Sequence, residues 1–248
     1  MNKYVDKNIK SLDNSYILNK THLELEMKKF AIFDTETNGV NNPYIYDIAW
    51  QIVDKKGNVY ESENFAIRET ITDPAIMCQA YYHKKVYTDY IEMLAGGMLE
   101  LVNYNFAMAK FNRQIKEHNV KVISAYNLGF DLRALKATNM LINKIPAANI
   151  SKKLERLDIW QFACETFLNS RTFKKEAFRN AWISDKGNIQ TGAEIAYKYL
   201  TGNPDFIEDH TALSDVEIER DILTKCFQYQ KKIPYGIVNA HPWRIVNS

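Results

Sequence analysis

The stretch FAIFDTETNG, residues 30–39, decides how the rest of the chain is interpreted. An apolar run is followed by two carboxylates and an Asn-Gly turn, which predicts a buried strand that stops abruptly. Side chains two positions apart on a strand point to the same face, so Asp34 and Glu36 are expected side by side. Adjacent carboxylates repel each other unless a cation lies between them. Taken alone, however, an Asp-x-Glu pair is more often two solvated acids at a turn.

The following sequence supplies the other elements of a mixed sheet. Residues 46–69 contain two strand-like runs joined by a Lys-Lys-Gly-Asn turn, which predicts a hairpin. Further patterns predict a helix over 98–118, a strand over 120–126 and a helix opening at Asp131. A strand and a helix are expected over 154–168. They are followed by a helix that Thr191 and Glu194 cap and Gly202 ends, and by a last helix from Thr211 to about Lys231. Strands first and then alternating helices and strands indicate one α/β domain, a mixed sheet with helices packed on it.

Composition excludes several classes of protein. The chain has 248 residues, of which 46% are hydrophobic and 25% charged, so it is neither disordered nor too short for a closed core. No apolar run is long enough for a membrane span, and the N-terminus has no signal-like hydrophobic stretch. Three separated cysteines without a CxxC pair argue against a zinc site or a disulfide framework and favour the cytoplasm.

Charge restricts how the chain could bind a polyanion. The 32 basic and 30 acidic residues leave a net charge of +2, which excludes a broad polyanion-binding surface. A nucleic acid would therefore need local basic patches or bound metal ions.

Three further residues each have an ordinary structural explanation. Asp131 follows a strand and could cap a helix, although Ala134 leaves no reciprocal capping box. Asp215 lies in the first turn of the last helix, where its charge suits the helix dipole. His210 precedes that helix, and only a loop position lets it reach the same site as Asp215, because five residues span about 140° around a helix.

Together these residues form a pattern that the separate explanations do not account for. Carboxylates from three segments, all at strand or helix ends, accompany one histidine. Hard oxygen ligands of this kind suit Mg²⁺ or Mn²⁺. Two such ions, about 3.5–4 Å apart, can clamp a phosphodiester during in-line displacement.

The spacing of these residues resembles that of a known family, the DEDDh (DnaQ-like) 3′→5′ exonucleases, which have a ribonuclease H-like fold. Three motifs carry the resemblance in the family's order: Asp34-Thr-Glu36-Thr37-Asn38-Gly39, Asn127-Leu-Gly-Phe130-Asp131 and His210-x4-Asp215. Thr211 stands where the sister group's Tyr-x3-Asp motif would need tyrosine, which favours the His subclass. The match covers roughly residues 29–230. It departs from the family in the long interval between the first two motifs and in Tyr126, where many members have His.

The resemblance implies roles for individual residues. Asp34, Glu36, Asp131 and Asp215 would hold two Mg²⁺ or Mn²⁺ ions, and His210 would be the general base. The substrate would contact Thr37 and Asn38 of the first motif, through backbone near them, and Asn127 and Phe130 of the second motif. Asp158, in a strand-to-helix stretch that also resembles the family, is interpreted as a helix cap.

The resemblance also implies an activity: hydrolysis from the free 3′ end of nucleic acid, single-stranded DNA favoured, releasing nucleoside 5′-monophosphates. A replication polymerase is a further candidate partner, and no membrane is expected. Two alternatives remain open, an exoribonuclease acting on RNA or short oligoribonucleotides and an inactive nucleic-acid-binding module.

One basic and aromatic segment adds candidate substrate contacts. Residues 170–182 interleave cations, among them Lys174 and Lys175, with aromatic rings, a combination that suits a single strand. An amphipathic helix with a solvated basic face explains the same pattern equally well. The expected organisation is an extension over 1–28, an exonuclease domain over 29–232 and a tail over 233–248.

Overall fold

A computed structural model describes residues 28–80, 86–229, 232–236 and 239–248. The expected N-terminal extension, apart from Lys28, lies outside the described residues. No helix within these described ranges is long and apolar enough to cross a membrane.

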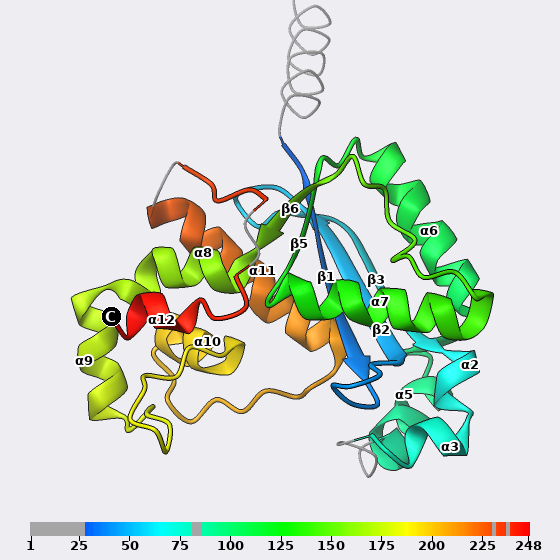
Figure 1. Cartoon of the computed structure of the whole chain (residues 1–248), viewed down its shortest axis with the longest axis horizontal. Coiled ribbons are helices and arrows are strands. Elements are labelled where there is room, and N and C mark those ends of the chain that lie inside the picture. The colour runs from blue at the N-terminus through cyan, green and yellow to red at the C-terminus, as the bar shows by residue number, and fades with distance from the viewer. Residues whose placement is uncertain (1–27, 81–85, 230–231, 237–238) are drawn as a thin grey trace, which may run out of the picture.

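The centre of the molecule is a six-stranded mixed sheet (Figure 1). Its spatial order is β4-β3-β2-β1-β5-β6. The strands are β1 (Phe30–Thr37), β2 (Ile45–Val53), β3 (Val59–Ile67), β4 (Glu100–Val102), β5 (Val122–Ala125) and β6 (Glu155–Asp158). The neighbours β1 and β2 are antiparallel, as are β2 and β3, whereas β1 pairs with β5, β5 with β6 and β3 with β4 in parallel. The prediction of a mixed-sheet α/β fold is confirmed.

Helices connect the strands and cover the sheet. Between β3 and β4 lie α2 (Arg68–Ile71), α3 (Pro74–Met77), the π-helical turn η1 (Val86–Tyr90) and α5 (Ile91–Ala95). Next come α6 (Tyr104–Glu117) and α7 (Leu128–Asn143). After β6 follow α8 (Ile159–Glu165), the 3₁₀ turn η2 (Phe167–Asn169), α9 (Arg171–Arg179), α10 (Ala193–Thr201), α11 (Ala212–Tyr229) and α12 (Trp243–Val246).

Strand periodicity divides the core between the two faces of the sheet. Phe30 and Ile32 of β1 join a core that contains residues of α8 and α11. Ala31 and Phe33, which alternate with them, join a second core with residues of α6 and α7. β1 is therefore covered on both faces, and only its last residues reach the surface.

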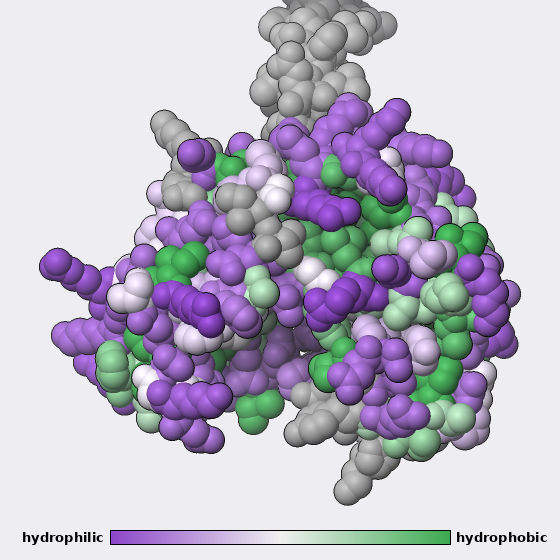
Figure 2. Space-filling view, in the orientation of Figure 1, coloured by the Kyte–Doolittle hydropathy of each residue, from purple (hydrophilic) through white to green (hydrophobic). Residues whose placement is uncertain are grey.

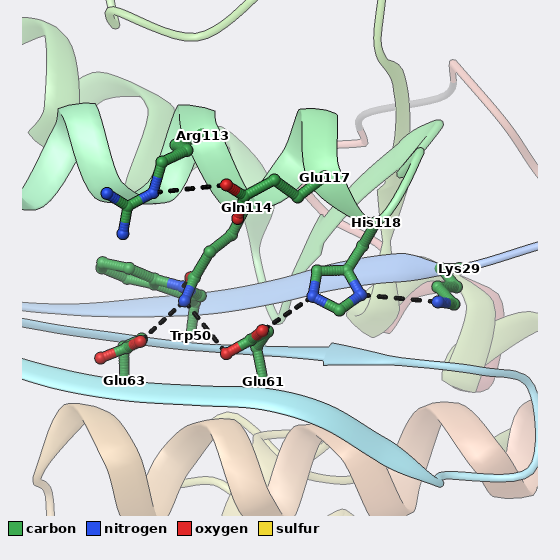
Figure 3. Close-up of polar contacts among 8 residues, drawn as sticks. All are labelled: Lys29, Trp50, Glu61, Glu63, Arg113, Gln114, Glu117 and His118. Carbon is green, nitrogen blue, oxygen red and sulfur yellow. Dashed lines mark hydrogen bonds and ion pairs between the residues drawn. The ribbon is translucent and has the colours of Figure 1, made fainter.

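A polar network attaches α6 to the sheet (Figure 3). Trp50 Nε1 donates to Gln114 Oε1 at 2.7 Å. Gln114 Nε2 in turn donates to Glu61 Oε2 at 3.1 Å and to Glu63 Oε1 at 2.7 Å. His118 Nε2 lies 2.8 Å from Glu61 Oε1. Because Trp50 is fully buried, its indole N–H needs this partner, which fixes the rotation of α6 against β2 and β3.

Three local predictions were wrong. The helix expected from residue 98 begins at Tyr104, because 100–102 form β4 and pair with β3. The helix expected to open at Asp131 begins at Leu128, so Asp131 lies within its first turn. Thr191 does not cap α10, whose N-cap is Gly192, because its hydroxyl accepts the indole N–H of Trp160 at 2.9 Å.

Candidate active site

The end of β1 brings the first two acids to the surface of the sheet. Asp34 lies opposite Ala49, and Glu36 lies opposite Asp47, on the neighbouring β2. On its other side β1 pairs with β5 only as far as Ile32, because β5 ends at Ala125 and the chain turns into α7. The edge of β1 beyond Ile32 therefore faces the start of a helix and not another strand.

That helix carries Asp131. Asn127 ends the turn before α7 in a left-handed conformation, with φ of 71°, which asparagine tolerates better than most residues. Asp131 is only 2% exposed, and its Oδ1 accepts the hydroxyl of Thr35 at 2.8 Å. Burial raises the pKa of Asp131 well above its usual range, and the negative charge of Asp34 raises it further.

Asp215 comes from the first turn of α11. The start of this helix is fixed by the sheet, because the Ala212 backbone N–H donates to Asp47 Oδ2 at 3.0 Å. Asp215 is 9% exposed, and its buried Oδ1 has no hydrogen-bond partner among the described residues. Burial, and then the charges of Asp34, Glu208 and Glu36, raise the pKa of Asp215 to about 11.

His210 lies beside these acids, outside the helix as expected. Its φ of 52° places it in the left-handed region. Side-chain ligand atoms of Glu36, His210 and Asp215 all lie within 4.8 Å of one another. The ring also meets a second acidic group, since its Nδ1 is 3.7 Å from Glu208 Oε2, and Glu194 lies within the same range.

Asp34 links the two sides of the cluster. Burial raises the pKa of Asp34 well above its usual range, and the charges of Glu36, Asp47 and Glu208 add to the effect. Asp34 is in turn a cause of the raised pKa of both Asp131 and Asp215. Electrostatic interactions therefore connect Asp34, Glu36, Asp131 and Asp215, and His210 lies beside Glu36 and Asp215.

The donor set suits a divalent cation. Every acid in the cluster destabilises the charge of the others, and the buried Asp215 Oδ1 lacks a donor. A hard cation offsets both effects, because it neutralises the charge and coordinates bare carboxylate oxygens. The chemistry of the site thus fits Mg²⁺ or Mn²⁺.

The other sequence-predicted contacts surround this cluster less closely. Thr37 and Asn38 follow Glu36 directly, but Asn38 is buried, and its Oδ1 accepts the Tyr44 backbone N–H at 2.8 Å. Its backbone N–H donates to the Tyr44 carbonyl at 3.2 Å, so both the side chain and the backbone of Asn38 close the loop after β1. Asn127 and Phe130 flank the start of α7 and are half-buried.

The basic segment forms a helix at another part of the molecule. Lys174 and Lys175 belong to α9, which Figure 1 places at the opposite edge of the molecule from α2 and α3. Phe173 and Trp182 are buried in the core, while Phe178 is 67% exposed. The expected interleaving of cations and exposed rings is therefore reduced to one ring, because the other two pack inward.

Four acidic residues of this region were not anticipated from the sequence. Glu208 and Glu194 lie beside His210, Asp47 holds the start of α11, and Glu219 is buried within α11. Glu219 alone had a sequence signal, because it follows Asp215 at the i+4 spacing that puts two side chains on one helix face. Nothing in the local sequence distinguishes Asp47 from an ordinary polar residue of a hairpin.

Figure 2 shows one face of the molecule, on which hydrophilic residues predominate around smaller hydrophobic patches, with a hollow in its lower half.

Comparison with known proteins identifies the fold. No family model and no curated protein sequence matches the chain. Solved structures of Exonuclease I do match. The structure of the E. coli enzyme with a dT13 oligonucleotide has 16% sequence identity and a TM-score of 0.51. A structure of SSB/Exonuclease I with an inhibitor has 18% identity and a TM-score of 0.53, and an ExoI/SSB-Ct complex has 18% identity and a TM-score of 0.52. The match confirms the α/β architecture of a mixed sheet flanked by helices.

The chain spans less than half of the length of the Exonuclease I chains that it matches. The matches cover 82–83% of this chain but only 42% of the Exonuclease I chains. At this identity the likeness establishes the fold and leaves the activity to be argued from the site.

Proposed function

We propose that the protein is a metal-dependent 3′→5′ exonuclease that releases nucleoside 5′-monophosphates from single-stranded DNA. The observation that carries the proposal is the meeting of Asp34, Glu36, Asp131 and Asp215 beside His210 at the end of β1. A ribonuclease H-like fold with E. coli Exonuclease I among its structural neighbours supports the same reaction class.

The residues divide the chemistry among them. Two divalent ions, held by the four carboxylates, would supply Lewis-acid stabilisation of the charge on the scissile phosphate. His210 accepts the proton of the attacking water as the new O–P bond forms and the bond from phosphorus to the 3′ oxygen of the preceding nucleotide breaks. Its place in the loop before α11 lets the ring approach the water while α11 holds Asp215.

Single-stranded DNA is the proposed substrate for two reasons. A net charge of +2 suits capture of an end better than wrapping of a duplex. Neighbouring Exonuclease I structures include a complex with an oligonucleotide and complexes with SSB. RNA remains the second candidate substrate, and Lys174 and Lys175 are proposed as outlying contacts to the strand.

The catalytic domain is proposed to span residues 29–232, with 1–28 as an extension and 233–248 as a tail, in the cytoplasm. The tail packs on the same core, since Val246 of α12 is 1% exposed.

A strand-polarity assay tests the proposal. Linear DNA and RNA oligomers labelled at either end are incubated with the protein in Mg²⁺ or EDTA. We expect stepwise loss from the 3′ end of linear DNA in Mg²⁺ only, and no cleavage of a circular single strand. Asp34→Asn should lose about 10²–10³-fold in rate, the range that transition-state charge stabilisation supplies.

Asp185→Asn, in an exposed turn, is the matched control and should keep the wild-type rate. Faster loss from RNA would move the assignment to an exoribonuclease. Equal cleavage of circular and linear strands, or full activity in EDTA, would contradict the proposal.

A further inference from the structure

Glu219 is a buried carboxylate that the family resemblance does not account for. It lies one helical turn after Asp215 on α11 and is 2% exposed. Its Oε2 has no hydrogen-bond partner among the described residues. The backbone N–H of Tyr126 donates to its carboxylate, so the group is held at the junction of β5 and α7.

The surroundings of Glu219 are acidic. Asp34, Asp131 and Asp215 are the charged groups whose fields act on it, one from β1, one from α7 and one from its own helix. No lysine, arginine or histidine within the described ranges forms an ion pair with it. Glu219 is therefore enclosed by three acids that the proposed function already assigns to cations.

A purely structural role does not explain this choice of side chain. A buried carboxylate without a counter-charge destabilises a fold, whereas a glutamine or an apolar residue of similar size would fill the same space without that cost. The Tyr126 N–H provides one hydrogen bond to the Glu219 carboxylate, and Oε2 has no donor among the described residues. The missing partner must be a proton or a cation, and the three neighbouring acids already require a cation.

We propose that Glu219 is a fifth carboxylate of the metal centre, on the same face of α11 as Asp215. The inference rests on the proposed function for the presence of the ions. Glu36, His210 and Asp215 have ligand atoms within 4.8 Å of one another, and Glu219 lies one helical turn further along α11.

The additional charge has a measurable consequence. Affinity of an oxygen-ligand site for a divalent ion rises with the number of charged ligands. Glu219 should therefore strengthen binding of one of the two ions and leave the other nearly unchanged. Replacing it by glutamine keeps the volume and removes only the charge.

Mn²⁺ binding to the full chain, without nucleic acid, tests the inference. Titration followed by electron paramagnetic resonance of free Mn²⁺ should give two ions per wild-type chain. Glu219→Gln should weaken one of them by about 10–100-fold, the range seen when a supporting partner of a metal ligand is lost. Glu217→Gln, at an exposed position two residues earlier on α11, should bind as the wild type does.

Two measurements keep failure to fold from deciding the outcome. Circular dichroism and thermal unfolding in EDTA should show Glu219→Gln at least as stable as the wild type, because a buried charge has been removed. Glu219→Asp, which keeps the charge, should retain more affinity than Glu219→Gln. Wild-type Mn²⁺ affinity and stoichiometry in Glu219→Gln would overturn the inference, and so would equal losses in Glu219→Gln and Glu217→Gln.

The same titration separates this inference from the proposed function. A Glu219-dependent Mn²⁺ site in a protein that cleaves no DNA or RNA would support the inference and contradict the exonuclease. Metal-dependent 3′→5′ cleavage with unchanged Mn²⁺ binding in Glu219→Gln would support the exonuclease and contradict the inference.

Discussion

His210 combines a strained backbone with a position beside the acids. Its φ of 52° lies in a region that residues with a side chain adopt rarely, although asparagine and histidine do so more often than others. Conformations of this kind persist where surrounding contacts enforce them, and they cluster at functional sites. Here the conformation turns the chain from the Glu208 segment into α11 and leaves the imidazole beside Glu36 and Asp215.

Replacement of His210 should lower turnover without removing the metal. His210→Asn keeps a side chain that tolerates the left-handed region but loses the general base. We expect kcat to fall by about 10²–10⁴-fold, the usual contribution of general acid–base catalysis. Single-turnover cleavage of a 3′-labelled oligomer measures the rate, and Mn²⁺ titration measures the affinity.

His210→Ala is the companion variant. It should lose the same rate and also some stability, because alanine is strained at this φ. A loss of Mn²⁺ binding in both variants as complete as in Asp215→Asn would show that His210 is a ligand. An unchanged rate and an unchanged pH profile would show that His210 takes no part in catalysis.

At the scale of the elements, the position of α11 depends on a strand far away in the sequence. Asp47 on β2 is fully buried, and its Oδ2 accepts the Ala212 N–H at 3.0 Å and the Tyr90 hydroxyl at 2.6 Å. It therefore acts as an N-cap supplied by another element, satisfying a backbone donor that the helix itself leaves open. The same carboxylate accepts from Tyr90 at the end of η1, so η1 and the start of α11 are attached to one residue of β2.

Loss of this cap should disturb both stability and the site. Asp47→Ala leaves two buried donors without a partner, which we expect to lower the free energy of unfolding by about 1–3 kcal/mol. The start of α11 would also be free to shift, so Mn²⁺ affinity should fall. Urea unfolding and Mn²⁺ titration measure the two effects.

Tyr90→Phe serves as the matched control for the cap. It removes the second hydrogen bond but keeps the one to Ala212, so it should lower stability while Mn²⁺ affinity stays at the wild-type value. Equal Mn²⁺ affinities in wild type, Asp47→Ala and Tyr90→Phe would show that Asp47 does not position the site.

At the scale of the whole molecule, the acid cluster couples folding to pH and to metal. The folded-state pKa of Asp215 is about 11, far above the ordinary value of 3.8, and those of Asp34 and Asp131 are raised in the same direction. A raised folded pKa means that the folded state holds the proton more tightly than the unfolded chain. This stabilisation is fully present below about pH 4 and is lost as pH rises through the folded pKa.

In EDTA the free energy of unfolding should therefore decline as pH rises from 5 to 9. One proton retained only by the folded state corresponds to a slope of about 1.4 kcal/mol per pH unit. Mg²⁺ should reduce the decline, because it binds the ionised cluster of the folded protein. Urea unfolding at pH 5, 7 and 9, with and without Mg²⁺, measures both slopes.

Asp215→Asn is the control for this linkage. Without the strongly shifted carboxyl, the decline in EDTA should become shallower, and Mg²⁺ should have less effect. Stability in EDTA that rises between pH 5 and 9, or that is the same with Mg²⁺ present, would contradict the account.

Local sequence was sufficient where a pattern and its structural consequence lie close together. The strand over residues 30–37, the hairpin after it and the loop position of His210 were predictable, because period-2 burial and turn residues act over a few positions. Asp158 was interpreted as a helix cap, and it accepts the Gln161 N–H at the start of α8.

Only the tertiary structure decided how these parts act on one another. The sequence placed Asp131 at a helix start but did not show that Thr35 would bind it, and it offered no reason to select Asp47 or Glu219. The rings of Phe173 and Trp182 were interpreted from the sequence as candidate contacts to a nucleic-acid strand, but both are buried in the core. Burial and pKa depend on segments that are distant in the chain and adjacent in space, whereas periodicity and spacing record only what each segment can do by itself.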